Sequence, residues 1–395
     1  MLPLFLTGAL PLAHLISFPA KLQDAATLAP ITGFQLNFPL IYFIFEPFFG
    51  LADALTLGLQ WPTVIFILWV IALLPFIKGW RRRLAILSAG ALFTAWAVLI
   101  PRPMAWITAD DPESLVLDFH SHSMASHDGR RSFTTEANAL WHQQQGFNAS
   151  FLTDHNTVAS ETAGPFSLAG EEVSLYKMSF VVLAPKTTVD RRPYNSNPWL
   201  MESFIKEMHK RGLLVIGVLP YYWISHWNKN PTVEDFIRWG IDGFEISSGD
   251  PRALGFPFRY RQKILELCRQ HNLIFNGASD NHGYGSAVPC WNVLHLPGWR
   301  SLSPLELETA VVAHLAKYRS AAVRVLERPR FRPANRLELA LSPIGISLVY
   351  ARTLSWPQTI SWILWIWGLT FLLEFLKFRR NSRRLPVSPL VERQV

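Results

Sequence analysis

The stretch at residues 115–129, LVLDFHSHSMASHDG, brings three histidines and two aspartates together directly after a short apolar run. In an extended chain, residues i and i+2 lie on one face, so His120 and His122 are expected to point at the same object. Two imidazoles that converge at the end of a buried strand are most simply explained by a metal ion. The stretch therefore predicts the first part of a metal site.

Acidic and histidine residues recur where later apolar runs end. A single histidine in a strand is usually a satisfied core or surface residue, and an unpaired carboxylate in apolar surroundings is costly. Recurrence at successive strand ends is what favours a shared site. The recurring residues are Asp154 and His155 after FLT, Glu171 and Glu172 in AGEEVS, and Asp280 and His282 in GASDNHG.

The elements that would position these residues alternate between strand-like and helix-like runs, from about residue 110 to 330. Repeated strand and helix, with polar residues where strands end, predicts a parallel α/β barrel or sheet with its site at the strand carboxyl ends. Strands are expected at 115–120, 147–153, 166–175, 179–184, 213–219, 243–247 and 273–278, and helices at 134–145, 198–211, 232–239, 258–271 and 304–318.

The regions that flank this domain are more apolar. The 395-residue chain is 50% hydrophobic and only 17% charged, and its apolar excess lies in residues 1–105 and 335–378. Three runs have the length and composition of transmembrane helices, at 61–77, 84–100 and 356–376. Weaker candidates for membrane association, interrupted by proline or charged residues, are 2–19, 36–59 and 337–349.

The net charge of +8 is concentrated in two basic clusters, at residues 78–83 and 377–384. Both clusters flank apolar spans, which makes them topology signals and argues against a nucleic-acid-binding face. The positive-inside rule places both clusters, and the basic tail 379–395, in the cytoplasm. The domain at 110–330 is then expected outside, which is the periplasm in a bacterium. The two cysteines, Cys268 and Cys290, show no metal or disulfide spacing and are expected to be buried free thiols.

Four segments in order resemble the successive motifs of the polymerase and histidinol phosphatase (PHP) family of metal-dependent phosphoesterases. They are DFHSHSMASHDG, FLTDHNT, AGEEVS and GASDNHGYG, and the resemblance covers residues 113–300. It implies a distorted (β/α)7 barrel that holds two or three divalent ions, manganese, zinc or iron. It further implies that His120, His122, Glu172 and Asp280 hold one metal, and that His155, His282 and either His127 or Asp128 hold another. Of the last two, we favour His127.

The sequence departs from the family pattern in two places. The family commonly has a histidine where Leu219 follows Val218, and it often has another a few residues after the glutamate motif, where LYKMSFVVLAP has none. Both missing histidines would serve the same metal, so we expect two divalent ions. His226 is a candidate substitute ligand.

The leading interpretation is a membrane-anchored phosphoesterase that hydrolyses a phosphate mono- or diester outside the cytoplasm, with metal-activated water as the nucleophile. Asp154 is expected to orient a metal-bound histidine through its second ring nitrogen. Arg130 and Arg252 are cationic candidates for binding phosphate. A phosphorylated small molecule or lipid-derived substrate and membrane lipid are the expected partners, with no nucleic acid. The alternative is a catalytically reduced metal-binding sensor or assembly domain.

Overall fold

The computed structural model describes residues 21–57, 60–159, 167–176, 178–218, 220, 231–250 and 258–382. Several expectations therefore lie outside the described residues. They concern the candidate span 2–19, Leu219, His226, Arg252 and the end of the basic tail, 383–395.

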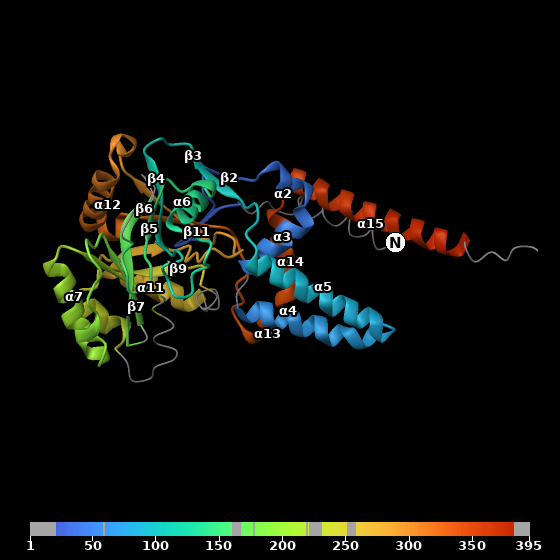
Figure 1. The fold of residues 1–395 in the computed structure, drawn as a ribbon, viewed down its shortest axis with the longest axis horizontal. Helices are drawn as coiled ribbons and strands as arrows, with labels where there is room; N and C mark the ends of the chain where they lie inside the picture. The colour runs from blue at the N-terminus through green and yellow to red at the C-terminus, as the bar shows by residue number, and fades with distance from the viewer. Residues whose placement is uncertain are drawn as a thin grey trace, which may run out of the picture.

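One curled ten-stranded sheet forms the centre of the α/β domain (Figure 1). Its strand order is β1-β12-β11-β4-β5-β6-β7-β8-β9-β10. An isolated bridge between Ser121 and Asn281 brings the segment after β10 back beside β4, so the sheet curves around its own centre. The strands are β1 Gln23–Asp24, β4 Ser114–Ser121, β5 Ala149–Leu152, β6 Ser167–Leu175, β7 Met178–Leu183, β8 Leu214–Val218, β9 Gly243–Ser247, β10 Ile274–Gly277, β11 Cys290–His295 and β12 Arg324–Glu327.

The sheet is mixed, which corrects the expectation of a parallel barrel or sheet, and it has ten strands where the resemblance implied a distorted barrel of seven. Pairs β4–β5, β5–β6, β8–β9 and β9–β10 are parallel. By contrast, β6–β7, β7–β8 and the pairs that β11 makes with β4 and β12 are antiparallel. The physical reason at β6–β7 is the connection, because parallel strands need a crossover of about a dozen residues and these two strands are joined by a tight turn at Tyr176. Strands β2 Phe34–Asn37 and β3 Trp106–Ala109 form a separate antiparallel pair.

Three helices of the domain, α6, α9 and α12, begin directly after the capping residues that predict them, whereas α7 begins at Met201, after the 3₁₀ turn that Asn197 caps. The Thr134 side chain accepts a hydrogen bond from the Ala137 amide, and Thr232 and Ser303 each form a reciprocal capping box with the acidic residue three positions on. The α-helices of the domain are α6 Thr135–Gln144, α7 Met201–Lys210, α9 Val233–Arg238, α11 Phe258–Gln270 and α12 Pro304–Tyr318. Short 3₁₀ helices are η3 Arg192–Tyr194, η4 Pro198–Leu200, η5 Trp299–Ser301 and η6 Arg319–Ala321.

The hydrophobic core lies between the sheet and these helices. Every residue of β4, β5, β8, β9 and β10 is buried, which matches the continuous apolar runs of strands covered on both faces. Phe180 on β7 packs against Phe204 of α7 and Phe236 of α9. The core therefore holds the carboxyl ends of β4, β5 and β9 in fixed positions. Cys268 and Cys290 are buried free thiols, as expected.

A second group of helices lies on one side of the sheet domain, away from α7 and α12 (Figure 1). Two of them, α5 and α15, are long and apolar enough to cross a membrane, although length and composition alone give weak support for an anchor. Only 6% and 11% of their apolar windows are buried, unlike the core helix of a soluble protein. The helices are α2 Leu40–Ile44, α3 Glu46–Thr56, α4 Gln60–Leu73, α5 Trp80–Leu99, α13 Arg336–Ala340, α14 Ser342–Thr353 and α15 Trp356–Ser382.

The expected span at 61–77 is not one continuous α-helix. It is divided between α4 and the 3₁₀ helix η1 Leu74–Phe76, which contains Pro75. Proline cannot donate the backbone hydrogen bond that would continue the α-helix. With 14 residues, α4 would extend about 21 Å at 1.5 Å per residue, which is short of a bilayer core of about 30 Å.

Candidate metal centre

Four side chains meet at the carboxyl end of β4. His120 Nε2 lies 2.9 Å from His122 Nε2 and 3.1 Å from a carboxylate oxygen of Glu172. The Asp280 Oδ1 atom lies 3.1 Å from His122 Nε2. All four side chains are buried or nearly so, with exposed fractions between 0% and 7%. The structure thus brings together the four residues expected to share one metal.

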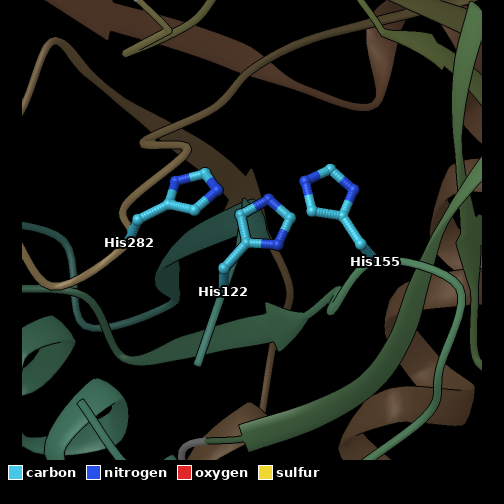
Figure 2. Close-up of side chains that lie close together, drawn as sticks. All are labelled: His122, His155 and His282. Carbon is cyan, nitrogen blue, oxygen red and sulfur yellow. The ribbon is translucent and has the colours of Figure 1, made fainter. Parts of the chain in front are cut away.

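A second group of donors adjoins the first. Figure 2 shows the His122 ring between the rings of His155 and His282, with centroid distances of 4.6 and 4.1 Å. Asp128 reaches both outer histidines, at 3.5 Å from His155 Nε2 and 3.3 Å from His282 Nε2. Glu172 also lies 3.1 Å from His155 Nδ1, so this carboxylate stands between the two groups.

The directions of these donors fit a bound cation better than a hydrogen-bonded network. His155 Nδ1 and His282 Nε2 are buried and lack a hydrogen-bond partner among the described residues, although carboxylate oxygens lie 3.1 and 3.3 Å away. The atoms are close but do not point at one another. Three sets of donor atoms lie within 4.8 Å of each other, namely His120–His122–Asp280, His122–His155–His282 and His127–Asp128–His155. Imidazole and carboxylate together suit zinc, manganese or iron. The cluster therefore indicates divalent metal binding.

The electrostatics of the cluster also favour positive charge. Burial alone would lower the pKa of His120, but the carboxylates of Glu245, Asp280 and Glu172 raise it well above its usual value. Burial alone would also lower the pKa of His282, but the Asp128 and Asp280 carboxylates raise this pKa to about 9. In turn the histidines hold the pKa of Glu172 well below its usual range, despite burial. The site is thus arranged to hold cationic charge in a buried place.

His127 and Asp128 both lie at the rim of the cluster, but they are not equally placed. The His127 side chain is 77% exposed, and its ring centroid lies 4.9 Å from that of His155. Asp128 contacts both His155 and His282. Although the sequence led us to favour His127, the geometry makes Asp128 the better-placed donor.

Asp154 does not face the centre of the cluster. Its carboxylate accepts hydrogen bonds from the Ser123 amide and hydroxyl, both at 2.7 Å, and from the Ser126 hydroxyl at 3.0 Å. The Ser126 Oγ atom in turn lies 2.9 Å from His122 Nδ1. Asp154 therefore positions His122 through Ser126, an arrangement typical of the outer partners of metal-binding histidines.

Glu245 is a residue of the site that we did not predict. It lies on β9, and its Oε1 atom is 2.7 Å from His120 Nδ1, on the opposite side of the ring from Glu172. Burial raises the pKa of Glu245 to about 7. A glutamate inside the apolar strand GFEIS is costly unless it is paired, and this was the signal that could have identified it.

Of the two arginines expected to bind phosphate, the structure describes only Arg130, and its guanidinium contacts backbone carbonyls. Arg130 donates to the carbonyl oxygens of Leu99 and Gly283, at 3.2 and 3.5 Å, so its guanidinium joins the end of α5 to the loop after His282. Arg252 lies outside the described residues.

The loop that follows the last metal motif rests on the end of α5. The Gly285 amide donates to the Val98 carbonyl at 2.8 Å, and Arg102 donates to the Gly285 carbonyl. A Cβ atom at Gly285 would lie 2.5 Å from the carbonyl oxygens of Ala97 and Ile100, so only glycine permits this close approach. The metal cluster and the apolar helices are therefore joined directly.

Comparison with known proteins finds partial likenesses. No protein-family profile and no curated protein sequence matches this chain. PsfC from Pseudomonas syringae is 15% identical with a TM-score of 0.37, over 59% of this chain and 98% of that one. A two-domain protein from Bacteroides vulgatus, described as containing a predicted PHP-like metal-dependent phosphoesterase, is 15% identical with a TM-score of 0.37. The match covers 54% of this chain and 65% of that one. A protein from Bifidobacterium adolescentis, described as a metal-dependent phosphoesterase, is 14% identical with a TM-score of 0.31. The match covers 43% of this chain and 88% of that one. At such low identity the metal centre rests on its own geometry.

Proposed function

We propose that this protein is a metal-dependent hydrolase that acts on phosphate mono- or diesters. The observation that carries the proposal is the convergence of four histidines and three carboxylates, with buried ring nitrogens that lack hydrogen-bond partners in the described part of the chain. The order of the four motifs, which resembles that of PHP phosphoesterases, supports phosphoesters as the substrate class.

Each residue of the cluster has a role in this proposal. His120, His122, Glu172 and Asp280 would hold one divalent ion, and His155, His282 and Asp128 a second. When bound, such ions polarise a phosphoryl oxygen and lower the pKa of water. Glu245 orients His120, while Asp154 orients His122 through Ser126. Because His127 and Asp128 are exposed, the substrate approaches from their side of the cluster.

The test is phosphoester hydrolysis by the full chain purified in detergent. We expect hydrolysis of simple aryl phosphate monoesters or diesters with added manganese, loss of activity with a chelator, and recovery when manganese is restored. Elemental analysis of the same sample reports the bound metal. If the protein holds metal but hydrolyses no member of a broad phosphoester panel, the alternative of a metal-binding sensor or assembly domain is favoured.

The proposed location is the outer face of a membrane, with α5 and α15 as anchors. The largely exposed apolar surfaces of both helices support this, as do the basic clusters at 78–83 and 377–384, which flank them on the same expected side. A phosphatase reporter that is active only outside the cytoplasm, fused after Asp110, is expected to be active. A fluorescent reporter that folds only in the cytoplasm and is bright at this position would contradict the topology.

A further inference from the structure

A cavity of about 60 Å³ lies where the apolar helices meet the sheet domain. Its walls come from α3, α14 and α15 and from the segment that follows β12. Three cations line it, Lys21, Arg328 and Arg330, together with apolar side chains that include Phe38, Ile346 and Val349. The volume is sufficient for a few water molecules or for one small polyatomic anion. The cavity is separate from the metal cluster, none of whose residues lines it.

The carboxylates near this cavity are already engaged. Asp53 accepts from Arg102 at 2.7 Å and from Arg328 at 2.6 Å, so one carboxylate serves two arginines. Glu46 accepts from the Tyr350 hydroxyl at 2.7 Å and from Gln358 at 3.0 Å, and its charge also acts on Lys21. Lys21, Arg102 and Arg328 therefore share Glu46 and Asp53, which leaves an excess of positive charge among the described residues.

Of the three arginines, Arg330 has the least compensated charge, because Arg102 and Arg328 each pair closely with Asp53. The nearby Glu327 binds Arg261 and Arg332 at 2.9 and 2.6 Å, whereas Arg330 lies 3.6 Å away. Arg330 Nη2 donates to the Ser247 hydroxyl at 2.9 Å. Its Nε and Nη1 atoms are buried and have no hydrogen-bond partner among the described residues, and the side chain is only 11% exposed. Burial lowers the pKa of Arg330, as expected for a cation that is short of counter-charge.

A buried cation with unsatisfied donors is costly unless an anion accompanies it. A guanidinium presents its donors in a planar fork that matches a phosphate or carboxylate group. A phosphate group offers several acceptor oxygens, which suits a cavity lined by Lys21, Arg328 and Arg330. The apolar wall, which includes Ile346 and Val349 of α14, would suit the glycerol or acyl portion next to such a group.

We propose that this cavity binds a phosphate-bearing anion, with Arg330 as its principal contact and Lys21 and Arg328 as supporting cations. The shared chemistry is a phosphate group, carried either by an anionic lipid headgroup or by free phosphate. The continuity of the cavity wall with α15, one of the two membrane-length helices, favours the lipid source. This inference does not depend on the proposed hydrolase activity.

The test uses the full chain in detergent and compares three added ligands. The protein is first treated with a chelator, so that phosphate cannot bind through metal at the cluster. One arm adds inorganic phosphate, a second adds mixed micelles with phosphatidylglycerol, and a third adds phosphatidylcholine as the uncharged control. The measurements are the thermal unfolding midpoint and the lipid retained on the protein by mass spectrometry. We expect phosphatidylglycerol to raise the midpoint, because a ligand that binds only the folded state stabilises it.

The decisive variant is Arg330→Gln, with Arg192→Gln as the matched control. Arg192 loses the same charge but lies in an exposed ion pair with Asp190, far along the chain from the cavity. Arg330→Gln is expected to weaken binding of the anion by about tenfold or more, since charge-assisted hydrogen bonds are lost. Without ligand its midpoint is expected to stay equal or to rise, because an uncompensated charge has been removed.

The outcomes separate the possibilities. If only phosphatidylglycerol raises the unfolding midpoint of the wild-type protein, the ligand is a lipid headgroup. If inorganic phosphate raises this midpoint, the ligand is free phosphate. If neither raises the midpoint of the wild-type protein, or if Arg330→Gln retains the full ligand-induced rise, the proposal is wrong. If Arg330→Gln lowers the unfolding midpoint relative to wild type by the same amount with and without the anion, Arg330 is purely structural. That result would also overturn the proposal.

Discussion

His122→Ala is expected to abolish metal-dependent phosphoester hydrolysis. His122 is central to the cluster, with Nε2 within 3.3 Å of atoms of His120, Glu172 and Asp280 and its ring between those of His155 and His282. Loss of a residue that only orients a metal ligand typically lowers metal affinity or activity by about 10–100-fold. Loss of the ligand His122 itself is therefore expected to lower kcat/KM by about 1000-fold or more. Initial rates with saturating manganese, and metal content by elemental analysis, measure the effect.

Two further variants make this prediction specific. His295→Ala removes an imidazole that is 68% exposed and pairs with Asp111, so activity should be unchanged. Glu245→Gln removes the charge that faces His120 Nδ1 at 2.7 Å but keeps the ligand itself. It should weaken metal affinity by about 10–100-fold, with activity recovered at high manganese. Full activity and metal content in His122→Ala would refute the assigned centre.

Asp53→Ala is expected to destabilise the junction between the apolar helices and the sheet domain. Asp53 on α3 accepts from Tyr42 at 2.8 Å and from Arg102 and Arg328, which lie far apart in the chain. Removing one partner of a buried ion pair leaves uncompensated charge, which typically costs about 3–5 kcal/mol. We therefore expect a marked fall in the thermal unfolding midpoint of the detergent-solubilised protein.

The effect should extend to the metal centre. Arg102 also donates to the carbonyl of Gly285, in the loop that follows Asp280 and His282. Loosening of Arg102 is therefore expected to reduce metal retention as well as stability. Asp190→Ala is the matched control, because the contacts of Asp190 in the described part of the chain are exposed ones with Arg192, and its loss should not move the midpoint. An unchanged midpoint in Asp53→Ala would show that the junction does not depend on this carboxylate.

Local sequence signals predicted most helices and strands of the sheet domain. Thr134, Thr232 and Ser303 cap helices within their own neighbouring residues, so their effect does not depend on the rest of the fold. The pairing of the strands was less predictable, because alternation of side chains is the same in parallel and antiparallel strands. Strands β1, β11 and β12 were missed, and together they form the antiparallel edge of the sheet.

The same distinction applies to the metal centre. The sequence alone determined which chemical groups are available, since His120 and His122 share one face of a strand end and later motifs supply further imidazoles and carboxylates. Only the tertiary structure placed Glu245 behind His120, Ser126 and Asp154 behind His122, and Asp128 between His155 and His282. These contacts join distant parts of the chain, and their geometry depends on how the sheet curls, which no local residue pattern specifies.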